Sequence, residues 1–176
     1  SGGEAVSLLT GRKDILLAPY PVFLLAADEW KAIAKSVAVR PLPYMLTYIV
    51  GPSKEKEIED IRALSGISEL VSIPAEGVGI EEFISLIEGA SIFVTDSFPG
   101  TAFASIFSTD MVLLRRFQDD DPSSQNVRLY ELTRRLGLGD RFFGGSIPPS
   151  PDWDTVSERI TDLRRSALDI LKKTLL

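Results

Sequence analysis

Short apolar runs alternate with amphipathic segments along this chain, and this alternation restricts the possible folds more than any other feature of the sequence. The runs are bounded by glycine, proline or polar residues, as strands commonly are. The segments between them carry apolar residues at helical spacing. Strands separated by helices predict an α/β fold, with a mostly parallel sheet covered by helices on both faces. The predicted strands are residues 44–50, 70–73, 92–94 and 111–114.

The predicted helices follow the same rhythm. Asp28 is expected to cap a helix that runs to Val37. Ser97 is expected to cap another, with Pro99 in its first turn, where the missing N–H of proline costs nothing. The remaining helices are expected at residues 54–65, 80–88 and 129–136, and from about 153 to the C-terminus.

The length of the chain supports one domain. With 176 residues, 44% of them hydrophobic, the chain can bury one sizeable core. We expect residues 1–18 to form a lead-in, residues 19–147 to form the domain, and residues 148–176 to form a C-terminal helix that packs on it. The first residues, Ser1–Gly3, are interpreted as a remnant of expression and are set aside.

Composition excludes several kinds of chemistry. The chain has no cysteine and no histidine, so catalysis would have to use carboxylates, lysine, arginine, tyrosine, serine or threonine. A net charge of −6 argues against nucleic acid as a partner, because phosphate contacts need clustered Lys and Arg.

No apolar run is long enough to span a membrane, and no signal-peptide pattern opens the sequence. We expect a cytoplasmic protein, with a peripheral position at the inner face of the membrane left open.

Residues Ser91–Phe107, SIFVTDSFPGTAFASIF, join a buried strand to a helix through a tight polar turn. Such a turn gathers backbone N–H groups at the positive end of a helix dipole, and that arrangement can bind an anion. Ser97, Gly100 and Thr101 are the candidate donors of N–H and hydroxyl groups. The alternative is that Ser97 is an ordinary N-cap, since most turns of this kind bind nothing.

Ligands of parallel sheets bind at the carboxyl ends of the strands. Asp96 lies at such an end, where it can orient a hydroxyl group of a ligand, act as a base, or only hold the turn. Of Arg115 and Arg116, one is expected to face this rim. The run Asp119–Asp121 is interpreted as a solvated loop, and no metal site is expected. The predicted rim consists of residues 51–53, 74–79, 96–101 and 115–128.

The stretch Val94–Phe107 resembles the signature of the polysaccharide pyruvyl transferase family, V-T-D-S-F-H-G-T-x-F-S-x-I-F. The resemblance extends in the family's order over roughly residues 20–143. The supporting segments are Pro21–Leu25 with Asp28–Trp30, similar to the family's DPVFLL…W, Tyr48–Gly51, similar to its strand-to-glycine element, and Asn126–Arg128 with Leu136–Leu138 and Asp140–Arg141, similar to its NSR…LGL.DR segment.

The resemblance implies a Rossmann-like domain that forms one half of a GT-B-type glycosyltransferase fold. It implies transfer of a pyruvyl ketal from phosphoenolpyruvate, the donor substrate, to a sugar of a surface polysaccharide, without a further cofactor. Family chains are about twice this length, and this one resembles their C-terminal, donor-binding half. The missing N-terminal domain and the saccharide acceptor are the implied partners, and the lead-in would be the end of the crossover between domains.

The resemblance also indicates site residues and one departure. Gly51, Asn126 and Arg128 fall in matching segments and join Ser97, Gly100 and Thr101 as candidate donor-binding residues. Arginine suits carboxylate or phosphate groups, although Arg128 can equally be a solvated helix residue. The signature histidine falls on Pro99, and the chain has no histidine to replace it.

Three functions remain open at this point. In the first, the domain is the donor-binding half of a pyruvyl transferase and is inactive alone. In the second, it is a degenerate family member that binds a glycan or an anionic metabolite without turnover. In the third, it is a structural domain that serves assembly. The substitution at Pro99 favours the second more than the rest of the resemblance does.

Overall fold

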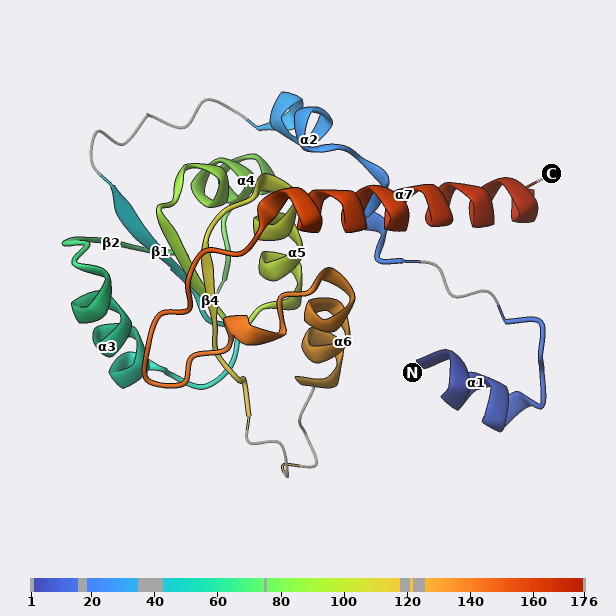
Figure 1. Ribbon diagram of the computed structural model, residues 1–176, viewed down its shortest axis with the longest axis horizontal. Helices are drawn as coiled ribbons and strands as arrows, with labels where there is room; N and C mark the ends of the chain where they lie inside the picture. The colour runs from blue at the N-terminus through green and yellow to red at the C-terminus, as the bar shows by residue number, and fades with distance from the viewer. Residues whose placement is uncertain are drawn as a thin grey trace.

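The computed structural model describes residues 2–15, 19–34, 43–74, 76–117, 121 and 126–175. Within this part of the chain a four-stranded sheet forms the centre, in the order β2-β1-β3-β4 (Figure 1). Every neighbouring pair of strands is parallel, which confirms the predicted α/β class. The strands lie where the apolar runs predicted them, at β1 (Tyr44–Tyr48), β2 (Glu69–Ser72), β3 (Ile92–Thr95) and β4 (Met111–Leu113).

Helices connect consecutive strands and surround the sheet. The helix α3 (Glu55–Ser65) joins β1 to β2, α4 (Ile80–Gly89) joins β2 to β3, and α5 (Phe98–Phe107) joins β3 to β4. The other helical segments are α1 (Gly2–Thr10), η1 (Pro21–Leu24), α2 (Ala27–Ile33), α6 (Asn126–Leu136), η2 (Gly139–Arg141) and α7 (Trp153–Leu175). None of the helices in the described ranges is long and apolar enough to cross a membrane.

The core has two parts because alternate strand residues point to opposite faces of the sheet. Leu46 and Phe93 face a large cluster that includes Ile84 of α4. Met45 and Val94 face a smaller cluster that includes Ile61 of α3. Each of these side chains is fully buried and stabilises the fold by about 1.5–3 kcal/mol. Helices therefore cover both faces, and the result is a three-layer, Rossmann-like α/β domain.

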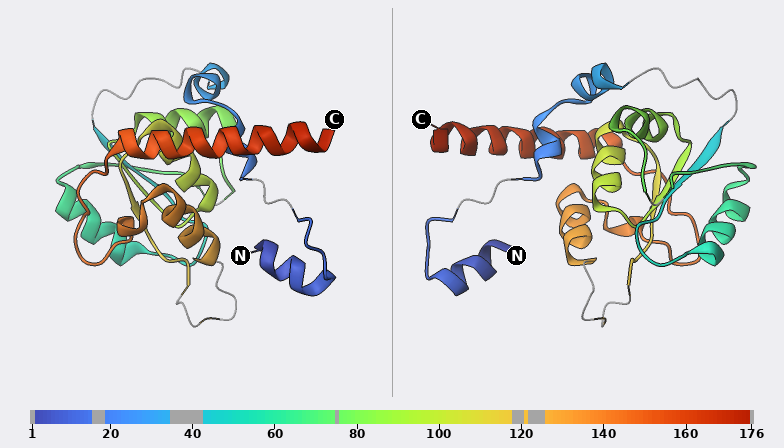
Figure 2. Two further views of the ribbon diagram at one scale, coloured as in Figure 1. Left: turned by 45° about the vertical axis from the view of Figure 1, so that its right-hand side comes forward. Right: turned by 180° about the vertical axis from the view of Figure 1, so that it is seen from behind.

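The long helix α7 packs on this domain through part of its length. It contacts α5, α6 and η1, and Val156, Ile160 and Ala167 are buried in those contacts. The Nε and Nη2 atoms of Arg164 donate to the carbonyl oxygens of Phe23 and Leu25, which fixes the segment around η1. Figure 2 shows that the C-terminal turns of α7 extend well past the sheet.

The start of α2 differs from the prediction. Asp28 is not the N-cap, because the helix begins at Ala27 and Asp28 lies within its first turn. The Glu29 carboxylate accepts a hydrogen bond from the Ala26 N–H at 2.7 Å and so satisfies the backbone at the helix start. The predicted end of this helix at Val37 lies outside the described residues. The prediction also assigned no helix to residues 2–10, which form α1.

The strand order creates a switch point between β1 and β3. The connection from β1 runs through α3 on one face, whereas α4 approaches β3 on the other face. The loops that follow β1 and β3 therefore diverge at the carboxyl edge of the sheet. Doubly wound folds bind ligands in the crevice at such points. The residues that fill this crevice are Asp96 and the loop beginning at Ile49.

Candidate functional site

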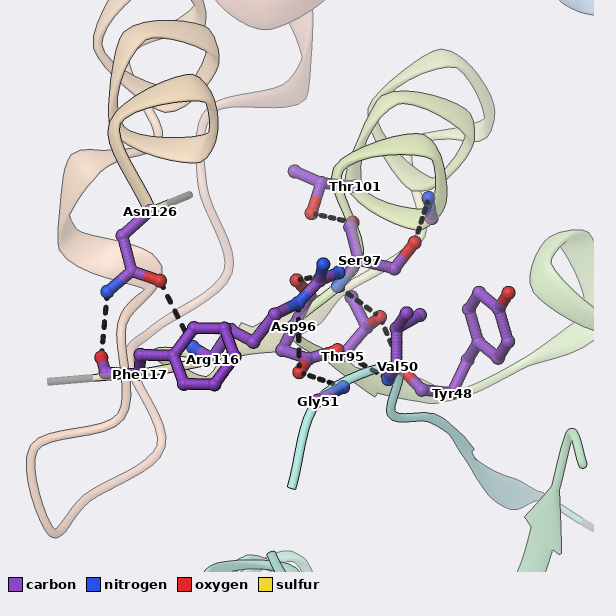
Figure 3. Close-up of polar contacts among 11 residues, drawn as sticks. Tyr48, Val50, Gly51, Thr95, Asp96, Ser97, Thr101, Arg116, Phe117 and Asn126 are labelled. Atoms are coloured by element: carbon purple, nitrogen blue, oxygen red, sulfur yellow. Dashed lines mark hydrogen bonds and ion pairs between the residues drawn. The ribbon is translucent and has the colours of Figure 1, made fainter. Parts of the chain in front are cut away.

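Asp96 occupies the switch point and ties the two diverging loops together (Figure 3). Its Oδ1 accepts a hydrogen bond from the Val50 N–H at 2.8 Å, and its Oδ2 accepts one from the Gly51 N–H at 2.8 Å. The side chain has no solvent exposure. Buried backbone N–H groups need acceptors, and the carboxylate supplies two of them. Asp96 therefore holds the turn, as one of the sequence interpretations proposed.

Gly51 is required by this arrangement. A Cβ atom on Gly51 would lie 2.4 Å from Cγ of Arg116 and 2.7 Å from Oδ2 of Asp96. Both separations are shorter than any normal contact, so a side chain here would displace the arginine, the carboxylate or both. Gly51 thus lies at the predicted site, and its N–H is directed at Asp96.

Arg116 lies across Gly51 and balances the charge of Asp96. Its Nε atom is 3.5 Å from Oδ2 of Asp96, and its Nη2 donates a long hydrogen bond of 3.4 Å to the Asp96 carbonyl oxygen. The Nε is buried but has no hydrogen bond of good geometry. About a fifth of the side chain, 20%, is exposed. The guanidinium is therefore neutralised but not saturated, and it keeps capacity to donate to a ligand.

Asn126, the first residue of α6, lies buried beside the end of β4. Its Oδ1 accepts a hydrogen bond from the Arg116 N–H at 3.2 Å, and its Nδ2 donates one to the Phe117 carbonyl oxygen at 2.8 Å (Figure 3). The side chain thus connects α6 to the strand end from which Arg116 extends. The sequence predicted that Asn126 lies at the site and binds the donor substrate directly. In the structure its amide bonds to the backbone of Arg116 and Phe117.

The polar residues at the start of α5 are engaged in the helix cap. The Ser97 Oγ accepts a hydrogen bond from the Gly100 N–H at 3.2 Å, which confirms the predicted N-cap. The N–H and the hydroxyl of Thr101 both donate to the Ser97 carbonyl oxygen at 2.9 Å. Pro99 has no N–H, so among residues 98–101 only the Phe98 N–H is left for a ligand.

Gly100 has a packing role at the same position. A Cβ atom there would lie 3.1 Å from the Phe93 ring and 3.2 Å from the Thr95 Oγ1. The small residue lets α5 approach β3 closely, which brings the helix start to the strand end. Close approach, not backbone freedom, explains the glycine.

A pocket of about 110 Å³ opens beside this helix start. Arg128 lies at its edge, with the guanidinium carbon 4.7 Å from the centre of the Phe98 ring, within cation–π range. Phe98 in turn packs edge-on against Tyr20. No carboxylate of the described residues pairs with Arg128, which is exposed. The pocket is lined by Asp96, Phe98, Pro99, Arg116, Asn126, Arg128 and Leu129.

The structure separates other candidates from this pocket. Arg115 points away, since its Nε donates to the Tyr130 hydroxyl at 3.1 Å, and Arg116 is the member of the pair that faces the rim. Asp119 and Asp120 lie outside the described residues. Among the residues that are described, no group of acidic, histidine or cysteine side chains is placed to hold a metal ion.

Sequence reasoning missed one aromatic member of the pocket and one pairing beside it. Phe98 was treated as part of the turn, although it carries Arg128 on its ring. The pairing of Arg116 with Asp96 joins residues from different strand ends. Both could have been found from the position of these residues in the sequence. Residues that directly follow β3 and β4 lie together at the carboxyl edge of a parallel sheet.

The fold and the pocket together define a class: a Rossmann-like α/β domain with two arginines beside a pocket at the carboxyl edge of a parallel sheet. No family model matches the chain, and no curated protein and no solved structure matches it either. What the site can do therefore rests on its own chemistry. Arg128 and Arg116 favour a small anion, while the Asp96 carboxylate is enclosed by the N–H groups of Val50 and Gly51 and by Arg116.

Proposed function

We propose that this domain is the donor-binding half of a polysaccharide pyruvyl transferase-like protein and that phosphoenolpyruvate binds in the pocket beside Pro99. One observation carries the proposal. Two segments that resemble the family, around Ser97 and Arg128, line this pocket, and a third, at Gly51, adjoins Asp96 and Arg116 of its wall. The three lie far apart in sequence, and a shared role in binding accounts for their resemblance and their meeting at one place.

Each group in the pocket has a role in this proposal. Arg128 holds the phosphate or the carboxylate of the donor, Arg116 binds its other end, and the Phe98 N–H adds a donor at the positive end of α5. The domain then serves as one half of a GT-B-type fold, and a second half supplies the acceptor sugar of a surface polysaccharide. This assignment places the protein in the cytoplasm, at or near the inner face of the membrane.

A second function is favoured by two specific observations. Pro99 lines the pocket where the family signature has histidine, and the Asp96 carboxylate is fully enclosed. The pocket thus offers binding groups without an accessible acid or base. The alternative is a degenerate family member that binds an anionic metabolite or a glycan without turnover.

Calorimetric titration of the chain with phosphoenolpyruvate tests the binding proposal. Arg128→Ala should weaken binding about 10- to 100-fold, because a hydrogen bond to a charged group contributes about 1.5–3 kcal/mol. Arg134→Ala is the matched control, since Arg134 is exposed on the same helix but does not line the pocket. Absence of binding, or equal affinity of wild type and Arg128→Ala, would reject the proposal. Parallel titrations with pyruvate and inorganic phosphate show which end of the donor is recognised.

A turnover assay of the chain tests the proposal that it forms only one half of a catalytic cleft. The chain alone should transfer no pyruvyl group to a pyruvyl-free polysaccharide, because one wall of a two-domain cleft cannot align both substrates or exclude water. Transfer by this chain would contradict the half-site proposal.

Pro99→His tests the departure from the signature. If the family role carries over, the imidazole should add a hydrogen-bond donor to the pocket and tighten phosphoenolpyruvate binding. Unchanged affinity in a folded variant would show that this turn is structural.

A further inference from the structure

The amide of Asn126 bridges two elements that each carry an arginine of the pocket. It accepts from the Arg116 N–H and donates to the Phe117 carbonyl oxygen, just after β4. Asn126 itself begins α6, and Arg128 lies two residues further along that helix. We propose that Asn126 is a positioning residue, which sets Arg116 and Arg128 in one frame so that both address the same anion. The role in anion binding rests on the proposed function.

The chemistry of the bridge requires an amide. One side-chain atom must accept a hydrogen bond and its neighbour must donate one, and a carboxylate can only accept. Asn126 is buried, so a lost partner leaves the Arg116 N–H or the Phe117 carbonyl oxygen without compensation. The two hydrogen bonds extend the strand end as a neighbouring strand would. They hold the backbone of residues 116 and 117 against the first turn of α6.

Arg116 depends on this backbone anchor because its charged partner holds it loosely. The Nε atom lies 3.5 Å from the Asp96 carboxylate without hydrogen-bond geometry, and the Nη2 bond to the Asp96 carbonyl is 3.4 Å long. Neither contact is short enough to fix the guanidinium by itself. The place where the side chain leaves the backbone therefore determines where its donors point, and Asn126 determines that place.

Asn126→Asp provides a test with a pH signature. At neutral pH the new carboxylate cannot donate to the Phe117 carbonyl oxygen, and it adds negative charge beside Arg116. Affinity for phosphoenolpyruvate should fall more than about 10-fold relative to wild type. A protonated carboxylic acid restores one donor and one acceptor in the same shape. The ratio of the wild-type affinity to the Asn126→Asp affinity for phosphoenolpyruvate should therefore return towards one as the pH falls to about 4–5, where a buried carboxyl is protonated.

A second readout needs no ligand. The ¹⁵N NMR signal of the Arg116 Nε–H group should shift in Asn126→Asp at neutral pH and return towards the wild-type position at low pH. Thr133→Val is the matched control, because it removes buried side-chain hydrogen bonds within α6 without touching residues 116 and 117. It should lower stability but leave both the Arg116 signal and the affinity unchanged. Asn126→Ala, which adds no charge, replaces Asn126→Asp if the latter does not fold.

The outcomes separate the two proposals. If wild type binds no phosphoenolpyruvate, the proposed function fails, and the Arg116 signal still decides whether Asn126 positions that side chain. If wild type binds but the Asn126 variants change neither affinity nor signal, the positioning role is overturned. Equal effects in Thr133→Val would also overturn it, because they would reduce Asn126 to a general support of α6.

Discussion

Two arginines, Arg141 and Arg116, lie at opposite ends of β4, and their guanidinium groups have different surroundings. At the amino end, Arg141 is 1% exposed, and its Nε and Nη2 donate to the Met111 carbonyl oxygen at 3.1 and 3.0 Å. Its Nη2 and Nη1 also donate to the carbonyl oxygens of Pro148 and Pro149. At the carboxyl end, Arg116 has a carboxylate partner but only long contacts and a buried Nε without a hydrogen bond.

The difference distinguishes structure from binding. Burial lowers the pKa of the Arg141 guanidinium, and the charges of Asp140 and Asp110 offset this only in part, so the fold tolerates a costly cation to satisfy several carbonyl groups. Arg116 lines a pocket, its side chain is 20% exposed, and its contacts with Asp96 are long. A saturated arginine fixes chain segments in place, whereas an unsaturated one can complete its bonds with a ligand.

The largest effect is expected from removing the saturated arginine. Arg141→Met should lower the free energy of unfolding by about 3–5 kcal/mol, because several buried carbonyl groups lose their donors. The same change at Arg116 should cost less, about 1–3 kcal/mol, since Asp96 keeps two backbone partners. Urea unfolding of both variants measures the difference. Equal losses would mean that both arginines are structural.

A smaller effect is expected from crowding the pocket end. Gly51→Ala should destabilise the domain by about 1–3 kcal/mol and weaken anion binding, because the added methyl group displaces Arg116 or Asp96. Gly144→Ala is the control, since its new methyl group would have no atom within 4 Å and the φ of Gly144 is not positive. Thermal unfolding and phosphate titration of the two variants check the prediction. An unaltered affinity in Gly51→Ala would show that the arginine can move without consequence.

The smallest effect is expected at the start of the last helix, where Asp152 precedes α7. Its carboxylate accepts hydrogen bonds from the Thr155 hydroxyl at 2.7 Å and from the N–H groups of Thr155 and Asp154, and these bonds lower its pKa. A lowered pKa gives stability that is present above the unfolded pKa and is lost as the pH falls through the folded pKa, below about pH 4. Asp152→Ala should therefore lower the melting temperature slightly at pH 7, and this difference should shrink steadily as the pH falls below about 4. A difference that does not change with pH in this range would exclude the carboxylate as its source.

Local patterns in the sequence were sufficient to predict the elements of the fold. Pro43 and Gly51 bound the run that forms β1, and Ser97 caps α5 as its position before Phe98 and Pro99 indicated. Gly137, with φ of 75°, directly follows α6, and the helix ends at Leu136 as its predicted range did. These signals depend on neighbours in the chain, so no knowledge of the tertiary structure was needed to find them.

The interactions within the site could not be predicted in the same way. Asp96 bonds to a loop 45 residues earlier in the chain, and only the strand order brings the two together. No local pattern indicated that Arg141 would be buried against carbonyl groups, because an isolated Asp-Arg pair usually lies on the surface. Asn126 was predicted to bind the donor substrate because its segment resembles the family, but its partners in the structure depend on how α6 meets the end of β4.

The parallel pairing of β1 with β3 also determines when the pocket can form during folding. Met45 pairs with Ile92, and the chain between them must first build α3, β2 and α4. Closing so long a loop is entropically expensive, and non-local parallel contacts of this kind form slowly. We therefore expect the Asp96 bridge and the arginines around it to assemble late, after local helices have formed. An anion that binds only the finished pocket should slow unfolding and leave the folding rate unchanged.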